Sequence, residues 1–448
     1  MQILFYRGDR ASLFTEIYDL SCCYILFFSV FLWGKSLYKQ MRISVLAFFL
    51  FFFCGLIVFS ACDEKHETEP SYPVDGDTCD RTVLVYMLGS NTLGGFVESN
   101  ISAMKKAVEK GALHNGNLLL YIDRYNTVPT LEKLSLRDGA VERTVVKSYE
   151  DRNSATVEAM SSVCDDVRTL YPASSFGLIL WSHANGWYPF HIEADLSAYS
   201  STRSFGDDEG KAMNIDEISL AIPDSMFDFI LCDACYMGTV EVAYDLREDC
   251  RYYVASPAAV MGGGFPYEDI VEHLFSCDKP IPENLIDVCR AYMDYYRSYY
   301  DPYGTISLID MREIEALARS VKLALVNSVD SLQVSEIQQF SQEKGTRVSY
   351  QNLFFDLNDY VGRVCVDTLA YSIFADCLDR TVLYADATNK GLSNILGAWV
   401  EFPIEQYCGL AAYIPGASSD EVADLYYKTL SWYKTVYGGM EVPIKITN

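Results

Sequence analysis

Positive charge is scarce in this sequence. It has 35 lysine and arginine residues against 61 aspartate and glutamate residues, which gives a formal net charge of −26 at pH 7. Nucleic acid and anionic membrane surfaces attract basic proteins, so this balance argues against both as partners. The acidity is compatible with cationic substrates, although in many proteins it serves only solubility.

Zinc ligands are also few. The sequence has 5 histidines, and outside the N-terminal region Cys232 and Cys235 form its one close cysteine pair. No second C-x-x-C and no H-x-x-x-H completes a tetrahedral zinc set, so we expect no metal site of this kind. A thioredoxin-like use of the C-x-x-C pair stays open. Against it, Asp233 between the two sulfurs would raise the thiol pKa by like-charge repulsion. Three further cysteines fall in helical patterns and are expected in the core, namely Cys164, Cys289 and Cys377.

Long apolar runs occur near the N-terminus. Residues 43–61 carry no charge, follow Met41-Arg42, and end in small residues directly before Cys62. A basic start, an apolar stretch and a small-residue cleavage site predict a signal peptide. With the cysteine in this position, the segment resembles the lipobox of bacterial lipoproteins. The resemblance implies cleavage before Cys62, acylation of its thiol, and an exported protein that a lipid anchors to the bacterial cell envelope. An ordinary transmembrane anchor is the alternative.

The chain divides into five expected regions. The first residues fit neither a signal nor a span, and Met41 by itself begins a complete signal peptide. An acidic, proline-containing stretch then separates the cysteine from the first strand, which is typical of a flexible tether. The expected regions are an upstream extension (1–40), a signal peptide (41–61), a tether (62–79), a catalytic core (80–277) and a C-terminal helical and strand subdomain (278–448).

Strands and helices alternate after the tether. This alternation predicts an α/β fold with a largely parallel sheet covered by helices on both faces, and a more helical C-terminal part. The expected strands are 82–90, 117–123, 175–183, 227–232 and 252–260; the helices are 97–110, 154–171, 282–299, 311–328 and 418–436; a hairpin is expected at 130–148, and strand-like pieces at 304–310 and 409–415.

A histidine and a cysteine each follow a buried strand. Cys235 comes directly after the apolar strand 227–232, and Thr239 then begins a helical pattern. His183 ends the strand 175–183, 52 residues before Cys235. If these strands are parallel neighbours, their carboxyl ends bring imidazole and thiol to one edge of the sheet. A thiol near an imidazole is the arrangement for nucleophilic acyl transfer.

The same residues carry a family resemblance. A strand, a histidine turn, about fifty residues, a second strand and Asp-x-Cys form the layout of the caspase-like clan of cysteine peptidases. The blocks "DRTVLVYMLGSNTL", "GLILWSHANGW", "FDFILCDACYMGTVEVAYDL", "YYVASPAAVMGGGFPY", "FFDLNDYV" and "GLAAYIP" resemble those of the clostripain family, in its order. The resemblance covers about residues 80 to 415. It implies a caspase-like αβα sandwich and a cysteine endopeptidase.

The resemblance also implies roles for individual residues. Cys235 would be the nucleophile and His183 the general base and acid. Backbone N–H groups of Cys235 and Ala184 would hold the oxyanion. The family usually has glycine after the histidine, and Ala184 can replace it only where the turn does not require a positive φ. Asp233 matches the acid at the base of the S1 pocket, which would select a basic P1 residue, with arginine above lysine because of its bidentate geometry.

Other residues near the expected site allow two interpretations. Trp187 and Tyr236 are either packing residues or a wall of the substrate site, and the glycine-rich stretch 261–267 is expected as a loop at the same edge. Members of the family can depend on calcium. The acidic run Asp207, Asp208 and Glu209 is a local cluster, but such runs are usually solvated loops. We expect no required cofactor and keep calcium as an open alternative.

The segment 195–222, between the two site residues, is rich in small and acidic residues. It predicts an exposed loop that is open to cleavage. The resemblance implies maturation in this interval, after Arg203 or, as second choice, after Lys211.

Two alternatives to a peptidase with polypeptide substrates remain. One is a binding protein with the same fold and impaired catalysis, and the other is a thiol–disulfide oxidoreductase that uses Cys232 and Cys235.

Overall fold

The computed structural model describes residues 80–188, 204–326, 328–341, 352–393, 400–419, 421–440 and 445–447. The chain divides into two units, Met1–Tyr72 and Pro73–Asn448, and the described residues all belong to the second unit. The expected extension, signal peptide and tether, with Cys62, lie outside the described residues, as does Arg203. Among the helices that are described, none has the length and apolar character needed to cross a membrane.

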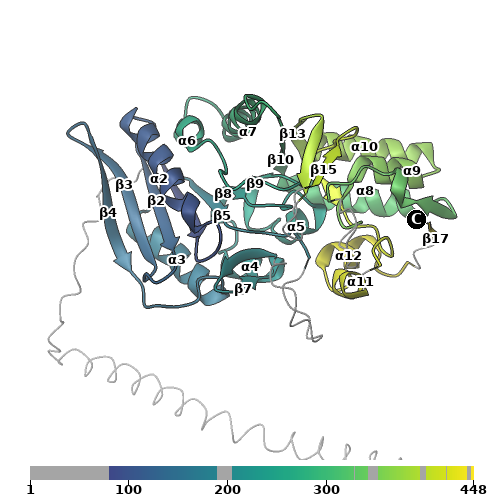
Figure 1. Ribbon diagram of the computed structural model, residues 1–448. Helices are drawn as coiled ribbons and strands as arrows, with labels where there is room; N and C mark the ends of the chain where they lie inside the picture. Colours follow the sequence, from purple (N-terminus) through teal and green to yellow (C-terminus); the bar gives the residue numbers. More distant parts are fainter. Residues whose placement is uncertain are drawn as a thin grey trace, which may run out of the picture. The chain divides into compact units, whose positions relative to one another are not determined.

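A large mixed sheet forms the centre of the fold (Figure 1). Within the described residues it has nine strands in the order β13-β10-β9-β8-β5-β1-β2-β3-β4. The strands β9, β8, β5, β1 and β2 are parallel, whereas β3, β4, β10 and β13 add antiparallel edges. The bounds are β1 Arg81–Leu88, β2 Gly116–Asp123, β3 Thr130–Arg137, β4 Ala140–Ser148, β5 Phe176–Trp181, β8 Phe227–Asp233, β9 Cys250–Ala255, β10 Thr305–Asp310 and β13 Val382–Ala387. The predicted, largely parallel α/β sheet is confirmed.

Helices cover both faces of this sheet. One face packs against α2 (Gly94–Glu109), α6 (Tyr267–Phe275) and α7 (Ile281–Arg297), which share one hydrophobic cluster with the sheet. The opposite face packs in a second cluster. Its helices are α3 Val157–Leu170, α4 Ile215–Ala221, α5 Val240–Asp245, α8 Ile314–Val326, α9 Leu357–Val364, α10 Thr368–Thr381, α11 Glu421–Tyr427 and α12 Ser431–Val436. The result is the αβα sandwich that the family resemblance implied.

The continuous apolar strands explain why the central strands were recognisable. All eight residues of β1 are buried, and five of the six residues of β5 are buried. A parallel strand between two helical layers buries both faces, and therefore it has no polar alternation. Cys164, Cys289 and Cys377 are buried on α3, α7 and α10, as expected.

The C-terminal part differs from the expectation in several elements. The expected helix 418–436 is two helices, because Leu430 turns to an extended conformation before α12 and buries its side chain. The expected strand 252–260 ends at Ala255, shortly before Pro257, which has no N–H for a sheet ladder. β10 and β13 lie after residue 277 and extend the main sheet, so the sheet is shared by both expected regions. The division of the chain at residue 277 stays a prediction.

Four small strand pairs and two short 3₁₀ helices complete the described structure. They are β6 Phe205–Asp208 with β7 Lys211–Met213, β11 Ser331–Gln333 with β17 Lys445–Thr447, β12 Phe355–Asp356 with β16 Ala411–Ala412, β14 Lys390–Ser393 with β15 Val400–Pro403, and the helices Met311–Glu313 and Val334–Glu336. The strand expected at 409–415 is thus only the two residues of β16.

The expectation of a loop throughout residues 195–222 is wrong for its second part. From residue 205 the chain forms the β6–β7 hairpin, and α4 follows. The turn of the hairpin uses Glu209 and Gly210, both with positive φ. Asn214 and Glu217 form a capping box at the start of α4, which fixes this helix locally. Lys211 is exposed and begins β7.

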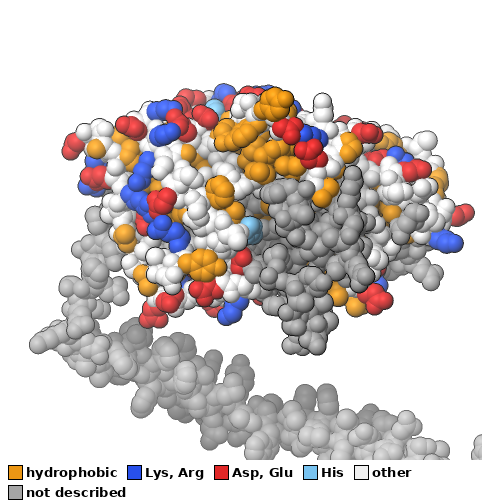
Figure 2. Space-filling view, in the orientation of Figure 1, with side chains coloured by type: hydrophobic (Ala, Val, Ile, Leu, Met, Phe, Trp, Pro, Cys, Tyr) orange, Lys and Arg blue, Asp and Glu red, His pale blue; other side chains and the backbone are white. Residues whose placement is uncertain are grey.

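The surface in Figure 2 has acidic and basic side chains intermixed, and an area of apolar side chains near α7. Tyr299 and Tyr300, which follow α7, are exposed. On this face the acidic excess is therefore distributed rather than gathered around one site.

Candidate active site

His183 and Cys235 lie at the same edge of the sheet. β5 and β8 are parallel neighbours, and their last registered pair is Trp181 with Asp233. Each of the two site residues comes two positions after its member of this pair. The parallel register therefore brings the imidazole and the thiol to adjacent strand ends, as the sequence predicted.

The thiol of Cys235 is half-buried and lies against the loop that follows β9. The N–H of Val260 donates to Sγ at 3.3 Å, and Sγ lies 3.4 Å from the carbonyl oxygen of Val260. Burial raises the pKa of the Cys235 thiol to about 11, the Val260 N–H lowers it in part, and the Asp233 carboxylate raises it further. In this resting geometry the sulfur is a neutral thiol at pH 7, so a nucleophilic reaction requires a base.

The imidazole of His183 contacts Thr92. The Oγ1 atom of Thr92 lies 2.8 Å from Nε2, and which atom donates depends on the tautomer. Thr92 is in the loop between β1 and α2, and β1 pairs with β5 on the side opposite to β8. Thr92, in the loop after a third strand, thus orients the histidine. A base that activates a nucleophile needs such a third group to hold it in position.

The turn after the histidine tolerates alanine. Ala184 is not among the described residues with positive φ, whereas Gly186 two positions later has a φ of +60°. Ala184 forms an isolated antiparallel bridge with Phe205, in which Gly206 N–H donates to His183 O at 2.9 Å. Alanine in place of glycine therefore causes no backbone strain at this position.

The two amides proposed for the oxyanion have no competing acceptor in the part of the chain that the structure describes. Neither the N–H of Ala184 nor that of Cys235 donates a hydrogen bond there. The next residue, Tyr236, has a φ of +60°, a conformation that costs a tyrosine about 1–3 kcal/mol and needs support from its surroundings. Its ring stacks on Phe354 at 4.8 Å between centroids, and its hydroxyl lies 3.1 Å from Ser393 Oγ. These contacts fix the turn that carries Cys235.

Asp233 is the last residue of β8 and is 5% exposed. It contacts Tyr267 and Phe265, which belong to the face of the sheet covered by α2, α6 and α7, whereas Cys232 belongs to the opposite face. Its Oδ2 accepts hydrogen bonds from the hydroxyl of Tyr267 at 2.7 Å and from the N–H of Phe265 at 3.2 Å. Burial raises the pKa of this carboxyl group to about 6, and the Tyr267 and Phe265 donors lower it in part. The glycine-rich loop covers the group: a Cβ on Gly264, whose φ is +67°, would lie 2.4 Å from Oδ2. The loop is thus at the predicted edge and forms one wall around the acid.

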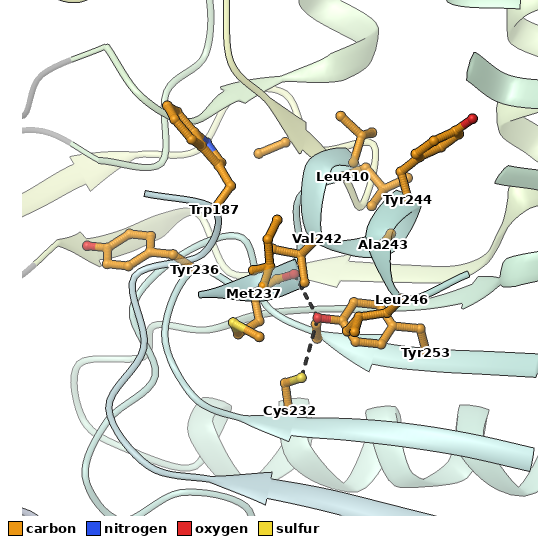
Figure 3. Packing of buried hydrophobic residues seen from close by; sticks show 14 of the residues in the cluster. Trp187, Cys232, Tyr236, Met237, Val242, Ala243, Tyr244, Leu246, Tyr253 and Leu410 are labelled. Atoms are coloured by element: carbon orange, nitrogen blue, oxygen red, sulfur yellow. Dashed lines mark hydrogen bonds between the residues drawn. The ribbon is translucent and has the colours of Figure 1, made fainter. Parts of the chain in front are cut away.

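Cys232 belongs to the core (Figure 3). Its Sγ donates to the hydroxyl of Tyr253 at 3.3 Å, and that hydroxyl donates to Met237 O at 2.9 Å. Burial raises the pKa of the Cys232 thiol to about 12. The two cysteines of the C-x-x-C pair therefore have separate surroundings, one in the apolar cluster and one beside Val260, and both are free thiols. This separation disfavours a redox pair.

The two aromatic residues near the site are packing residues. Trp187 is fully buried, and its ring lies 4.8 Å from that of Tyr413 and 5.3 Å from that of Tyr427. Tyr236 is 1% exposed. Neither forms a wall of an open substrate site.

The acidic run near the site is partly structural. Asp207 and Asp208 lie on β6, and Asp208 Oδ2 accepts from the N–H of Ser154 at 2.6 Å. Among the described residues, no group of three metal-ligating side chains is arranged to hold an ion.

Sequence reasoning missed three residues that contact the expected site, namely Thr92, Val260 and Tyr267. Thr92 lies in the loop after β1, Val260 in the loop after β9, and Tyr267 at the start of α6. The Gly-Ser-Asn-Thr and Gly-Gly-Gly-Phe-Pro-Tyr stretches were the signals for Thr92 and Tyr267, whereas Val260 fell in the strand expected at 252–260.

The fold and the paired residues define a class, the caspase-like α/β cysteine peptidases. A family model described as the clostripain family matches residues 85–402, more than half of the chain. The chain belongs to the clostripain family, a family of cysteine peptidases.

Known relatives are similar over most of the described structure. The solved structure of an inactive zymogen C11 protease from Parabacteroides distasonis is 32% identical, with a TM-score of 0.69, and the alignment covers 81% of this chain and 99% of that chain. A secreted C11 cysteine protease from Bacteroides thetaiotaomicron, solved with an irreversible peptide inhibitor, is 26% identical with a TM-score of 0.70, over 80% of this chain and 99% of that one. Clostripain of Hathewaya histolytica is 26% identical over an alignment of length 222, with a coverage of 43% for this chain and 42% for that relative, so the chain matches less than half of the length of this curated relative.

Proposed function

We propose that the protein is an exported cysteine endopeptidase that cleaves polypeptides after arginine or lysine, with Cys235 as nucleophile and His183 as base. The observation that carries the proposal is the register of β5 and β8, which puts both residues two positions beyond the last strand pair in a chain of the clostripain family. Nucleophile and base are both protein groups, so the reaction requires no metal or other cofactor.

The proposed reaction begins with proton transfer. His183 takes the proton of the Cys235 thiol, and the sulfur leaves Val260 to attack the scissile carbonyl carbon. The N–H groups of Ala184 and Cys235 stabilise the negative oxygen of the tetrahedral intermediate. Collapse of the intermediate breaks the C–N bond, and His183 protonates the leaving amine. Water, deprotonated by His183, then hydrolyses the thioester and regenerates the thiol.

Thr92 is proposed to hold the imidazole during both proton transfers. Its hydroxyl contact with Nε2 restrains the orientation of the ring. The raised pKa of the Cys235 thiol, about 11, makes this base necessary at neutral pH.

Asp233 is proposed to bind the basic P1 side chain. A carboxylate that is 5% exposed and close to the nucleophile in sequence is a strong site for a cationic group, because little water screens it. Export is supported by the signal-like leader and by the secreted relative from Bacteroides thetaiotaomicron.

The rival function, peptide binding without cleavage, rested on Ala184. The backbone at Ala184 lies outside the positive-φ region, so its N–H can take the direction that glycine would provide. This observation favours a competent oxyanion site.

A thiol-reactive peptidyl-arginine probe tests the proposal. We expect intact-mass analysis of the purified chain to find one added probe, and peptide mapping to assign it to Cys235. Cys235→Ala and His183→Ala should each abolish labelling and hydrolysis while leaving the melting temperature nearly unchanged. Cys232→Ala is the matched control, because it removes the neighbouring buried thiol and should leave labelling intact. An unlabelled, folded wild-type chain with a free Cys235 would overturn the peptidase function in favour of the binding protein.

A further inference from the structure

The two carboxyl oxygens of Asp233 differ in the hydrogen bonds that they accept. Oδ2 accepts two hydrogen bonds, one from the Tyr267 hydroxyl at 2.7 Å and one from the Phe265 N–H at 3.2 Å. Within the described residues, Oδ1 accepts none. The two oxygens of this acid are therefore not equivalent as acceptors for a ligand.

The donors to Oδ2 are held in place by their surroundings. Tyr267 is fully buried at the start of α6, and its ring belongs to the cluster beneath α2, α6 and α7. The hydroxyl of Tyr296, on α7, donates to Gly264 O at 2.8 Å and thereby fixes the loop that carries Phe265. Gly264 itself packs so closely that a Cβ there would lie 2.4 Å from Oδ2 and 2.9 Å from Oδ1. A ligand cannot approach either oxygen from the side of this loop without displacing it, so the two oxygens differ in their hydrogen bonds and not in their cover by the loop.

The occupancy of Oδ2 decides which cations the acid binds well. An ionised carboxylate offers about four lone-pair directions, two on each oxygen. Tyr267 and Phe265 use both directions of Oδ2. A bidentate guanidinium contact needs one direction on each oxygen, so arginine reaches Asp233 only through Oδ1. The ammonium of lysine is a point charge that needs a single acceptor, and it loses nothing by this arrangement.

We propose that Tyr267 determines the P1 selectivity of this site: by donating to Oδ2 of Asp233 it removes the bidentate arginine contact, so that lysine and arginine are accepted with similar efficiency. This inference rests on the proposed function and refines its substrate class. It replaces the expectation from the sequence that arginine exceeds lysine.

The test compares kcat/KM for a pair of peptide substrates that differ only in arginine or lysine at P1, at pH 8. In the wild type we expect the two values to agree within about threefold. Tyr267→Phe keeps the buried ring and removes the donor, which frees one direction of Oδ2. The arginine-to-lysine ratio should therefore rise by roughly ten- to a hundredfold, as expected for one hydrogen bond to a charged group. The ratio cancels any general loss of activity in the variant.

Tyr296→Phe is the matched control. Tyr296 is on α7, and its hydroxyl contacts the same loop. The variant removes this buried hydroxyl, which donates to Gly264 O and not to Asp233. The ratio in this variant should stay at the wild-type value. Melting temperatures of both variants establish that they are folded.

Three results would overturn the inference. They are a wild-type preference for arginine above the expected threefold, an unchanged ratio in folded Tyr267→Phe, or an equal rise in Tyr296→Phe, which would assign the effect to loosening of the loop. The wild-type measurement decides even where Tyr267→Phe fails to fold. A wild-type chain that cleaves neither substrate and takes no probe at Cys235 would instead overturn the proposed function, and this inference with it.

Discussion

The ionisation of Asp233 should control the cleavage of basic substrates between pH 5 and 8. Burial raises the pKa of this carboxyl group from 3.8 to about 6, and the Tyr267 hydroxyl and Phe265 N–H offset only part of that rise. A protonated acid has no charge to attract a P1 cation. The ratio kcat/KM reports ionisations of the free enzyme and free substrate. It should therefore fall to about half of its high-pH value at pH 6, and by roughly tenfold for each pH unit below 6.

The measurement must separate the ionisation of Asp233 from the reactivity of Cys235, which also depends on pH. We therefore divide kcat/KM for a lysine substrate by the alkylation rate of Cys235 with iodoacetamide, an uncharged reagent too small to need the P1 contact. The quotient should rise with pH through a midpoint near 6 and then level off.

Asp233→Asn provides the matched variant. It removes the charge, and a charge-assisted hydrogen bond contributes about 1.5–3 kcal/mol, so kcat/KM for basic substrates at pH 8 should drop by roughly ten- to a hundredfold. The alkylation rate should rise, because the Asp233 carboxylate no longer raises the pKa of the Cys235 thiol, and the pH dependence of the quotient should disappear. A wild-type quotient that is flat from pH 5 to 8 would refute the reasoning, because Asp233 would then either not bind the P1 side chain or keep a pKa near its ordinary value of 3.8.

Four other outcomes are expected. Cys232→Ala should lower the free energy of unfolding by about 1–2 kcal/mol in chemical denaturation, with little loss of activity, because it removes a buried sulfur and its contact with Tyr253; equal loss of activity to that of Cys235→Ala at unchanged stability would contradict the assigned roles. Glu241 on α5 is fully buried, and burial raises the pKa of its carboxyl group from 4.5 to about 7, so the folded state retains a proton that the unfolded state releases. The contribution of this group to the free energy of unfolding should therefore fall by roughly 3 kcal/mol between pH 4 and 8. Glu241→Gln should remove this part of the decline in a pH series of melting temperatures, and an unchanged slope would count against it. An alkyne fatty acid supplied to a bacterial host should label the wild type and not Cys62→Ser, and labelling of that variant would exclude lipidation there. Intact-mass analysis should find a cut after Arg203 in active protein and none in Cys235→Ala, whereas a fully active uncut chain would end the idea of self-processing.

The choice of Arg203 over Lys211 as the cleavage position gained support from the fold. Lys211 begins a strand of a short hairpin, where its backbone is paired with Asp208. A peptidase binds its substrate as an extended, accessible segment, so a paired hairpin residue is the poorer site. Arg203 lies outside the described residues, and its cleavage stays a prediction.

The central strands could be predicted because burial on both faces demands continuous apolar sequence. The strands expected at 82–90, 117–123 and 175–183 agree with β1, β2 and β5 to within two residues at each end. The expected helix 418–436 failed because a helical pattern does not show that Leu430 will turn inward. The strand expected at 409–415 is confirmed only for the two residues of β16, because an apolar run between glycine and proline can be buried with most of its residues outside a sheet ladder.

The sequence alone determined that a cysteine and a histidine each end a buried strand, because an apolar run followed by a turn is a local feature. Only the tertiary structure decided that β5 and β8 are neighbours, that Thr92 reaches the imidazole, that Val260 holds the thiol, and that Tyr267 occupies one oxygen of Asp233. The physical reason is that these partners come from other strand ends, between 25 and 91 residues away in the chain. Strand order and register bring them together, and no local pattern of residues encodes that order.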